Sequence, residues 1–143
     1  MDLSKIKATD LPVRQPGSTD VEWVLEMLLT RRGSTAYKLA IYVFSNTEVS
    51  PNTAIIDAAT GTDRTIAHRL RFLEALITIN RPLTKKEYGS VYSLLTHRSS
   101  RLRQKAEQVL TTLCPDGPPP WMPPEVMQEF ERKARLAVAM YLR

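Results

Sequence analysis

The chain has 143 residues, of which 43% are apolar and 24% are charged, and its net charge is +5. This composition predicts one globular domain and excludes a wholly disordered chain, a collagen and a disulfide scaffold. There is no run of about eighteen apolar residues and no visible signal peptide, so we expect no membrane association and an intracellular protein, cytoplasmic or nuclear. Cys114, His68 and His97 are too few for a Cys/His metal cluster, and we expect no cofactor.

The positive charge is concentrated in one stretch of the chain. Between Thr60 and Lys105 there are ten basic and three acidic residues, an excess of +7, so the rest of the chain carries −2. A local excess of this kind attracts molecules of opposite charge and indicates an anionic partner. The alternative is a basic face that interacts only with solvent.

The expected organisation is a leader followed by one helical domain. Residues 1–19 contain two prolines and a glycine but no hydrophobic period, which predicts a flexible leader or a strap lying on the domain. Residues 20–143 are expected to form the single all-helical domain, with three helix pairs over 20–113, a proline-rich connector over 114–124 and a C-terminal helix over 125–143.

Two capping residues predict the first helix pair. Thr19, with Glu22 three residues later, forms a capping box and predicts a helix to about Arg31. Ser34 is the expected cap of a second helix, which should stop near Ser45.

The second pair is predicted from a proline and a glycine. Ser50 before Pro51 predicts the start of a short third helix, and Gly61 ends it. Thr62 or Asp63 then begins a longer fourth helix. Its expected buried stripe consists of apolar residues at steps of four, three and four: Ile66, Leu70, Leu73 and Ile77.

The third pair depends on a second capping box. Thr84 and Glu87 have the box spacing, and Leu83 and Tyr88 can pack together beside it as a hydrophobic staple. Ser99 or Ser100 then caps the sixth helix. An extended ribbon after Thr84 would contradict the whole arrangement in pairs.

The proline-rich connector and the last helix have open roles. The connector holds Trp121 and is expected to cover one end of the domain, but it also resembles an extended ligand for an aromatic groove in another protein. The helix over 125–143 is either part of the domain or the docking element of a structural subunit.

The first and third pairs are similar in sequence. Residues 28–40 align without gaps to residues 94–106, with six of thirteen positions identical. Together with residues 100–110, this pattern resembles the two-helix unit of HEAT and armadillo proteins, over about residues 20–113. The resemblance implies a short right-handed solenoid of stacked antiparallel helix pairs that binds protein and sometimes nucleic acid. An irregular bundle of six or seven helices is the alternative.

Stacked pairs predict a binding site on the basic stretch. The turns within the pairs would line one edge of the stack. Basic residues on the second helix of each pair would project beside this edge, where the N-termini of those helices also favour anions. We therefore expect a non-enzymatic scaffold or adaptor that holds another protein by an acidic segment, with a nucleic-acid backbone as the alternative partner. Its oligomeric state is open. The expected partner-binding residues are Arg64, Arg69, Arg71, Arg98, Arg101, Arg103 and Lys105.

Residues 51–76 also resemble a helix-turn-helix of DNA-binding regulators. Gly61 separates a short helix from a longer one, which would lie in the major groove. Residues 75–79 and 89–95 would then supply a strand-like wing. The residues expected to reach the DNA are Arg64, His68, Arg69 and Arg71.

Catalysis has little support in the sequence. A Ser/His/Asp arrangement can be drawn from Ser99, His97 and Asp63, but there is neither a nucleophile elbow nor a phosphate-binding loop. We therefore expect a protein that is not an enzyme.

Overall fold

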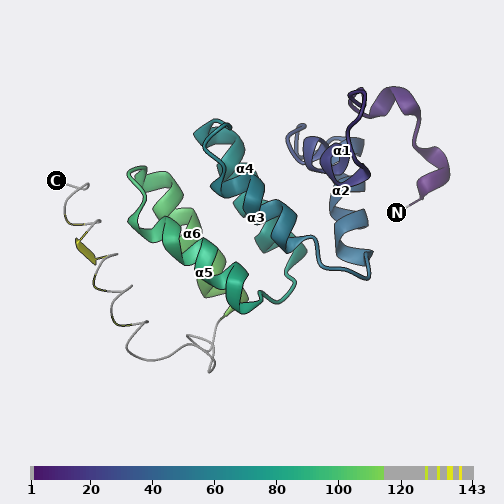
Figure 1. Cartoon of the computed structure of the whole chain (residues 1–143). Coiled ribbons are helices and arrows are strands. Elements are labelled where there is room, and N and C mark those ends of the chain that lie inside the picture. Colours follow the sequence, from purple (N-terminus) through teal and green to yellow (C-terminus); the bar gives the residue numbers. More distant parts are fainter. Residues whose placement is uncertain (1, 115–127, 129–131, 133–134, 137–138, 140–143) are drawn as a thin grey trace.

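The computed structural model describes residues 2–114 and, beyond them, residues 128, 132, 135, 136 and 139 (Figure 1). Apart from Cys114, the predicted connector lies outside the described residues, as does most of the predicted helix over 125–143.

The described chain is all-helical. Its α-helices are α1 (Asp20–Met27), α2 (Thr35–Asn46), α3 (Asn52–Thr60), α4 (Ile66–Ile79), α5 (Lys85–Ser93) and α6 (Ser100–Leu113). Its 3-10 helices are η1 (Leu3–Lys5), η2 (Ala8–Asp10) and η3 (Leu94–Thr96). No β-strand occurs between residues 2 and 114, so the predicted all-α class is confirmed.

The helices pack as three consecutive pairs: α1 with α2, α3 with α4, and α5 with α6. Figure 1 shows the pairs following one another across the molecule, with α3 and α4 between the other two. Contacts of α4 with α2 and α6, and of α3 with α5, join the pairs. One hydrophobic core therefore runs through all six helices.

Side-chain caps begin four of the helices where the sequence predicts them. The Oγ atoms of Thr19, Ser34, Thr84 and Ser99 each accept a hydrogen bond from the backbone amide three residues later. These bonds satisfy amides that the first turn of a helix leaves unpaired. The predicted starts of α1, α2, α5 and α6 are therefore confirmed.

The fifth helix forms as expected, and the wing does not. Glu87 Oε1 accepts the backbone amide of Thr84 at 2.8 Å, and Thr84 Oγ1 accepts the backbone amide of Glu87 at 3.2 Å. Residues 75–79 lie in α4 and residues 89–95 lie in α5 and η3, so the prediction of a strand-like wing is wrong. The complete capping box satisfies two amides locally and outweighs the β-propensity of the residues that follow.

The fourth helix starts later than the sequence indicates. Its cap is Thr65, rather than Thr62 or Asp63, and the Thr65 hydroxyl accepts the amide of the third residue along. The guanidinium of Arg64 bonds to Glu26 Oε1 of α1 at 3.1 Å. The longer turn before α4 therefore contains an arginine that forms an ion pair with the first helix pair.

The first helix ends at Met27 rather than at about Arg31. The carbonyl oxygens of Leu28 and Thr30 accept hydrogen bonds from Arg71 Nη2 of α4, at 2.8 and 2.5 Å. These carbonyls face a neighbouring helix instead of continuing the helical ladder. The end of α1 is therefore set by a residue more than forty positions along the chain.

The central helix buries a wider face than the predicted stripe. Of the four residues expected there, only Leu73 is fully buried, while Ile66, Leu70 and Ile77 are half-buried. Because α4 packs against α2, α3 and α6, its core surface extends beyond one stripe. Its buried residues are Arg69, Phe72, Leu73, Ala75, Leu76 and Ile79.

Residues 11–18 lie as a strap on α1. The indole Nε1 of Trp23 donates to the carbonyl of Pro12 at 2.9 Å. The guanidinium of Arg14 lies 5.6 Å from the centre of the Trp23 ring and forms an ion pair with Asp20 at 2.6 Å. This part of the predicted leader is thus held by specific contacts.

The observed start of α4 predicts different effects for two threonines. Thr65→Ala removes the cap and should lower the free energy of unfolding by about 1 kcal/mol, measured by urea denaturation. Thr62→Ala, at an exposed position in the same turn, is the matched control and should change it by less than about 0.5 kcal/mol. The reverse order of effects would contradict the assigned start.

Candidate functional site

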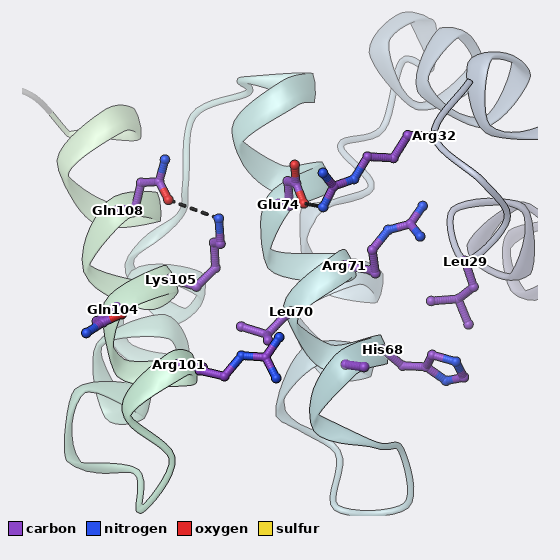
Figure 2. Close-up of a pocket in the computed structure, with 11 residues that line it drawn as sticks. Leu29, Arg32, His68, Leu70, Arg71, Glu74, Arg101, Gln104, Lys105 and Gln108 are labelled. Atoms are coloured by element: carbon purple, nitrogen blue, oxygen red, sulfur yellow. Dashed lines mark hydrogen bonds and ion pairs between the residues drawn. The ribbon is translucent and has the colours of Figure 1, made fainter. Parts of the chain in front are cut away.

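An open groove of about 630 Å³ runs between α4 and α6. In Figure 2, Arg101, Lys105 and Gln108 follow one another along α6 in the same direction as His68 and Glu74 along α4, so the two helices are parallel. All three helix pairs contribute to the groove, because the turn between α1 and α2 closes one side. The groove is lined by Leu29, Arg32, Ala67, His68, Leu70, Arg71, Glu74, Arg101, Gln104, Lys105 and Gln108.

Cationic side chains outnumber the single carboxylate of the groove. Glu74 is the only acidic residue in the lining, and it forms an ion pair with Arg32. Lys105 donates to Gln108 Oε1 at 3.0 Å, so a neutral amide is its neighbour. Within the described part of the chain, Arg101 has neither a hydrogen bond nor an ion pair (Figure 2). The α6 side of the groove therefore presents positive charge that no carboxylate in the lining neutralises.

Two predicted site residues hold the first helix pair to the second. Arg71 lies in the groove lining, but its guanidinium is bonded to the end of α1 and lies 5.4 Å from the centre of the Tyr37 ring. Arg64 pairs with Glu26 and lies 5.0 Å from the centre of the Phe72 ring. These cations already have partners within the fold.

Two further predicted residues are buried, so the expectation that they project to a partner is wrong. Arg69 is 5% exposed and Arg103 is 3% exposed. Arg69 Nε donates to the carbonyl of Ala59 at 2.7 Å, and Arg103 Nη1 donates to the carbonyls of His97 and Arg98 at 2.7 and 3.0 Å. Both guanidinium groups satisfy carbonyls at the C-terminal end of the preceding helix or turn, which a helix leaves unpaired.

Arg69 and Arg103 occupy the same position in successive pairs. Each lies four residues after the N-cap of a second helix, Thr65 in α4 and Ser99 in α6. In the first pair this position is Lys38, which is exposed. The buried arginine is therefore a feature shared by the second and third pairs.

Arg81 performs the same task for α2. Its Nη1 donates to the carbonyls of Phe44 and Thr47 at 3.0 and 2.8 Å. The end of α2 is thus closed by a residue from the connector between α4 and α5. Several arginines of the basic stretch therefore bind backbone carbonyls of the protein itself.

The predicted site residues therefore separate into distinct groups. Arg71, Arg101 and Lys105 line the groove, Arg64, Arg69 and Arg103 hold other elements, and Arg98 is exposed but is not part of the lining.

Sequence reasoning missed other lining residues. They are Leu29, Ala67, Leu70, Glu74, Gln104 and Gln108. The sequence already places His68 among the expected DNA contacts and Arg32 in a turn of the expected basic edge. The available signal was the shared helical face of each set, 67/70/71/74 on α4 and 101/104/105/108 on α6, but sequence spacing does not show that these two faces adjoin.

The helix-turn-helix alternative loses most of its expected DNA contacts. The structure has a helix pair over residues 52–79, but α4 is packed between α2 and α6. Three of the four expected contact residues, Arg64, Arg69 and Arg71, are engaged within the protein. Of the four, His68 is exposed.

The histidine and serine considered for catalysis have other contacts. Nδ1 of His97 accepts the backbone amide of Ser99 at 2.9 Å. The Ser99 hydroxyl caps α6 by accepting the amide of Leu102 at 3.3 Å. The serine Oγ is therefore directed to a helix start rather than to the imidazole.

Nothing matches this chain in comparisons with protein-family models, curated proteins and solved structures. Among the described residues, no group of three or more His, Cys, Asp or Glu side chains is arranged to hold a metal ion. No helix within the described residues has the length and apolar character needed to cross a membrane.

The buried arginine of α4 predicts a stability effect that its exposed counterpart does not. Arg69→Met leaves the Ala59 carbonyl without its donor and should lower the free energy of unfolding by about 1–3 kcal/mol. Lys38→Met, at the same position after the N-cap of α2, should change it by less than about 0.5 kcal/mol. Equal effects in urea denaturation would contradict the role assigned to Arg69.

The environment of His97 predicts a pH dependence of stability. Burial, and then the charges of Arg69 and Arg103, lower the pKa of His97 below 6.5. Unfolding therefore takes up a proton at pH values between the folded pKa and 6.5, so this contribution to stability is complete above 6.5 and is lost as the pH falls through that window. Replacing His97 with Asn, which keeps an acceptor for Ser99, should flatten this part of the stability profile.

An NMR titration of the imidazole gives the direct measurement. The structure predicts a midpoint below 6.5 for His97. A midpoint above that value would contradict the arrangement of the two arginines around the histidine.

Proposed function

We propose that this protein is a non-enzymatic binding scaffold that holds an acidic protein segment in the groove between α4 and α6. The observation that supports it is the charge of the lining, where Arg32, Arg71, Arg101 and Lys105 accompany Glu74 as the one carboxylate. Arg101 is exposed and Lys105 is half-buried, so both are accessible to a partner. Acidic groups gain electrostatic attraction there without first displacing a carboxylate from α6.

The composition of the lining favours protein over nucleic acid as the partner. No Phe, Tyr or Trp side chain belongs to the lining, and stacking on such rings supplies much of the affinity for single-stranded bases. The lining also contains the apolar side chains Leu29, Ala67 and Leu70, which are suited to apolar groups of a peptide.

Stacked helix pairs are part of the same proposal. The lining residues come from the turn between α1 and α2, from α4 and from α6. The groove therefore exists only when three successive pairs lie side by side. Composite surfaces of this kind are what stacked two-helix units provide. The scaffold is therefore proposed as a short HEAT-like array.

Charge reversal tests the proposed site. The double variant Arg101→Glu/Lys105→Glu should weaken binding of a labelled acidic peptide, of about 20 residues, by about tenfold or more in fluorescence anisotropy. The matched control, Lys38→Glu/Lys85→Glu, changes the net charge equally at exposed positions outside the lining and should have little effect. Raising the salt concentration from about 50 to 200 mM should weaken binding to the unmodified protein.

Two results would contradict the proposal. One is an acidic peptide that does not bind at low salt. The other is an equal loss of affinity in the groove variant and its control, which would assign binding to the net charge of the protein.

A further inference from the structure

The groove has two chemically different parts. Leu29, Ala67 and Leu70 are the apolar part of the lining, and the other residues have cationic, amide, imidazole or carboxylate side chains. On α6 the exposed face carries Arg101 and Lys105, four residues apart, which places them roughly 6 Å apart along the helix axis. A ligand that fits both parts needs an apolar stripe flanked by acidic groups at a similar spacing.

Several common modes of peptide binding lack what they need here. Adding a strand requires an exposed sheet edge, and the described residues contain no strand. A polyproline ligand requires a groove of Tyr, Trp or Phe side chains, and the lining contains none of these. A phosphate clamp requires several arginines free to converge, but Arg32 is paired with Glu74 and Arg71 is bonded to the end of α1.

The remaining mode is a helix in a groove. Residues 67–74 of α4 and 101–108 of α6 extend the lining over roughly 10 Å along parallel axes, about two turns of a helix. A third helix laid along two parallel helices brings its residues at three- and four-residue spacing to the lining. Acidic residues at i and i+4 on that helix have the same axial spacing as the two cations on α6.

We infer that the partner segment is an acidic amphipathic α-helix, whose apolar stripe packs on the apolar part of the lining and whose carboxylates pair with Arg101 and Lys105. This inference rests on the proposed function and specifies its ligand. The chain's own C-terminal residues 124–143 contain three acidic residues followed by four basic ones, so the segment as a whole carries +1 and would add positive charge to a groove that is already cationic. The occupant is therefore a segment of another protein.

The test compares probes of equal charge. The first is an acidic peptide of about 20 residues with leucines at three- and four-residue spacing, long enough to form a helix when bound. The second is the same peptide with two central residues replaced by proline, which prevents the helix. The third is a single-stranded oligonucleotide of similar charge. Affinities are measured by fluorescence anisotropy, and peptide helicity by circular dichroism.

The inference predicts that the first peptide binds at least about tenfold tighter than the proline peptide and gains helicity on binding. Arg101→Glu/Lys105→Glu should remove this binding, and Lys38→Glu/Lys85→Glu should retain it. Ala67→Gln, which adds bulk to the lining at an exposed position without changing the charge, should weaken binding of the helical peptide more than binding of the proline peptide.

Each other outcome contradicts a different statement. Equal affinity of the two peptides, lost in the α6 variant, would overturn the helical ligand and leave the proposed function standing. Tighter binding of the oligonucleotide through Arg101 and Lys105 would overturn the acidic-protein partner. Failure of both peptides to bind at low salt would overturn the proposed function itself.

Discussion

The arrangement of the helix pairs depends on arginine side chains that bind backbone carbonyls at helix ends. Arg71 binds the end of α1, Arg81 that of α2, Arg69 that of α3, and Arg103 the turn after η3. The last carbonyls of a helix have no partner within it and carry the negative end of its dipole. A guanidinium offers several N–H donors in one plane, so one side chain can satisfy two such carbonyls while it fixes the position of a neighbouring helix.

This use of arginine changes what the net charge means for the surface. The basic stretch suggests a broad cationic edge, but several of its arginines donate hydrogen bonds to backbone carbonyls inside the fold. Burial, and then the positive charges of Arg69 and Arg103, lower the pKa of His97. The charge that remains accessible in the groove is concentrated on α6.

The groove follows from the same packing. Arg71 holds the turn between α1 and α2 against α4, and this contact brings Leu29 and Arg32 to one side of the groove. The other side is formed by α6. The structural arginines and the proposed binding cations are thus neighbours on the same helices. On α6 they differ by position, since Arg103 points into the fold and Arg101 and Lys105 lie on the face that lines the groove.

The helical class, four helix starts and the complete capping box of α5 could be predicted from the order of residues along the chain. These features depend on contacts between residues three or four positions apart, so their chemistry is visible in the chain. The end of α1, the buried face of α4 and the separation of buried arginines from accessible ones were decided by tertiary structure. Arg69 finds its carbonyl ten positions away and Arg71 finds one forty-three positions away, and no local spacing encodes which carbonyl a long, flexible side chain reaches after the helices have packed.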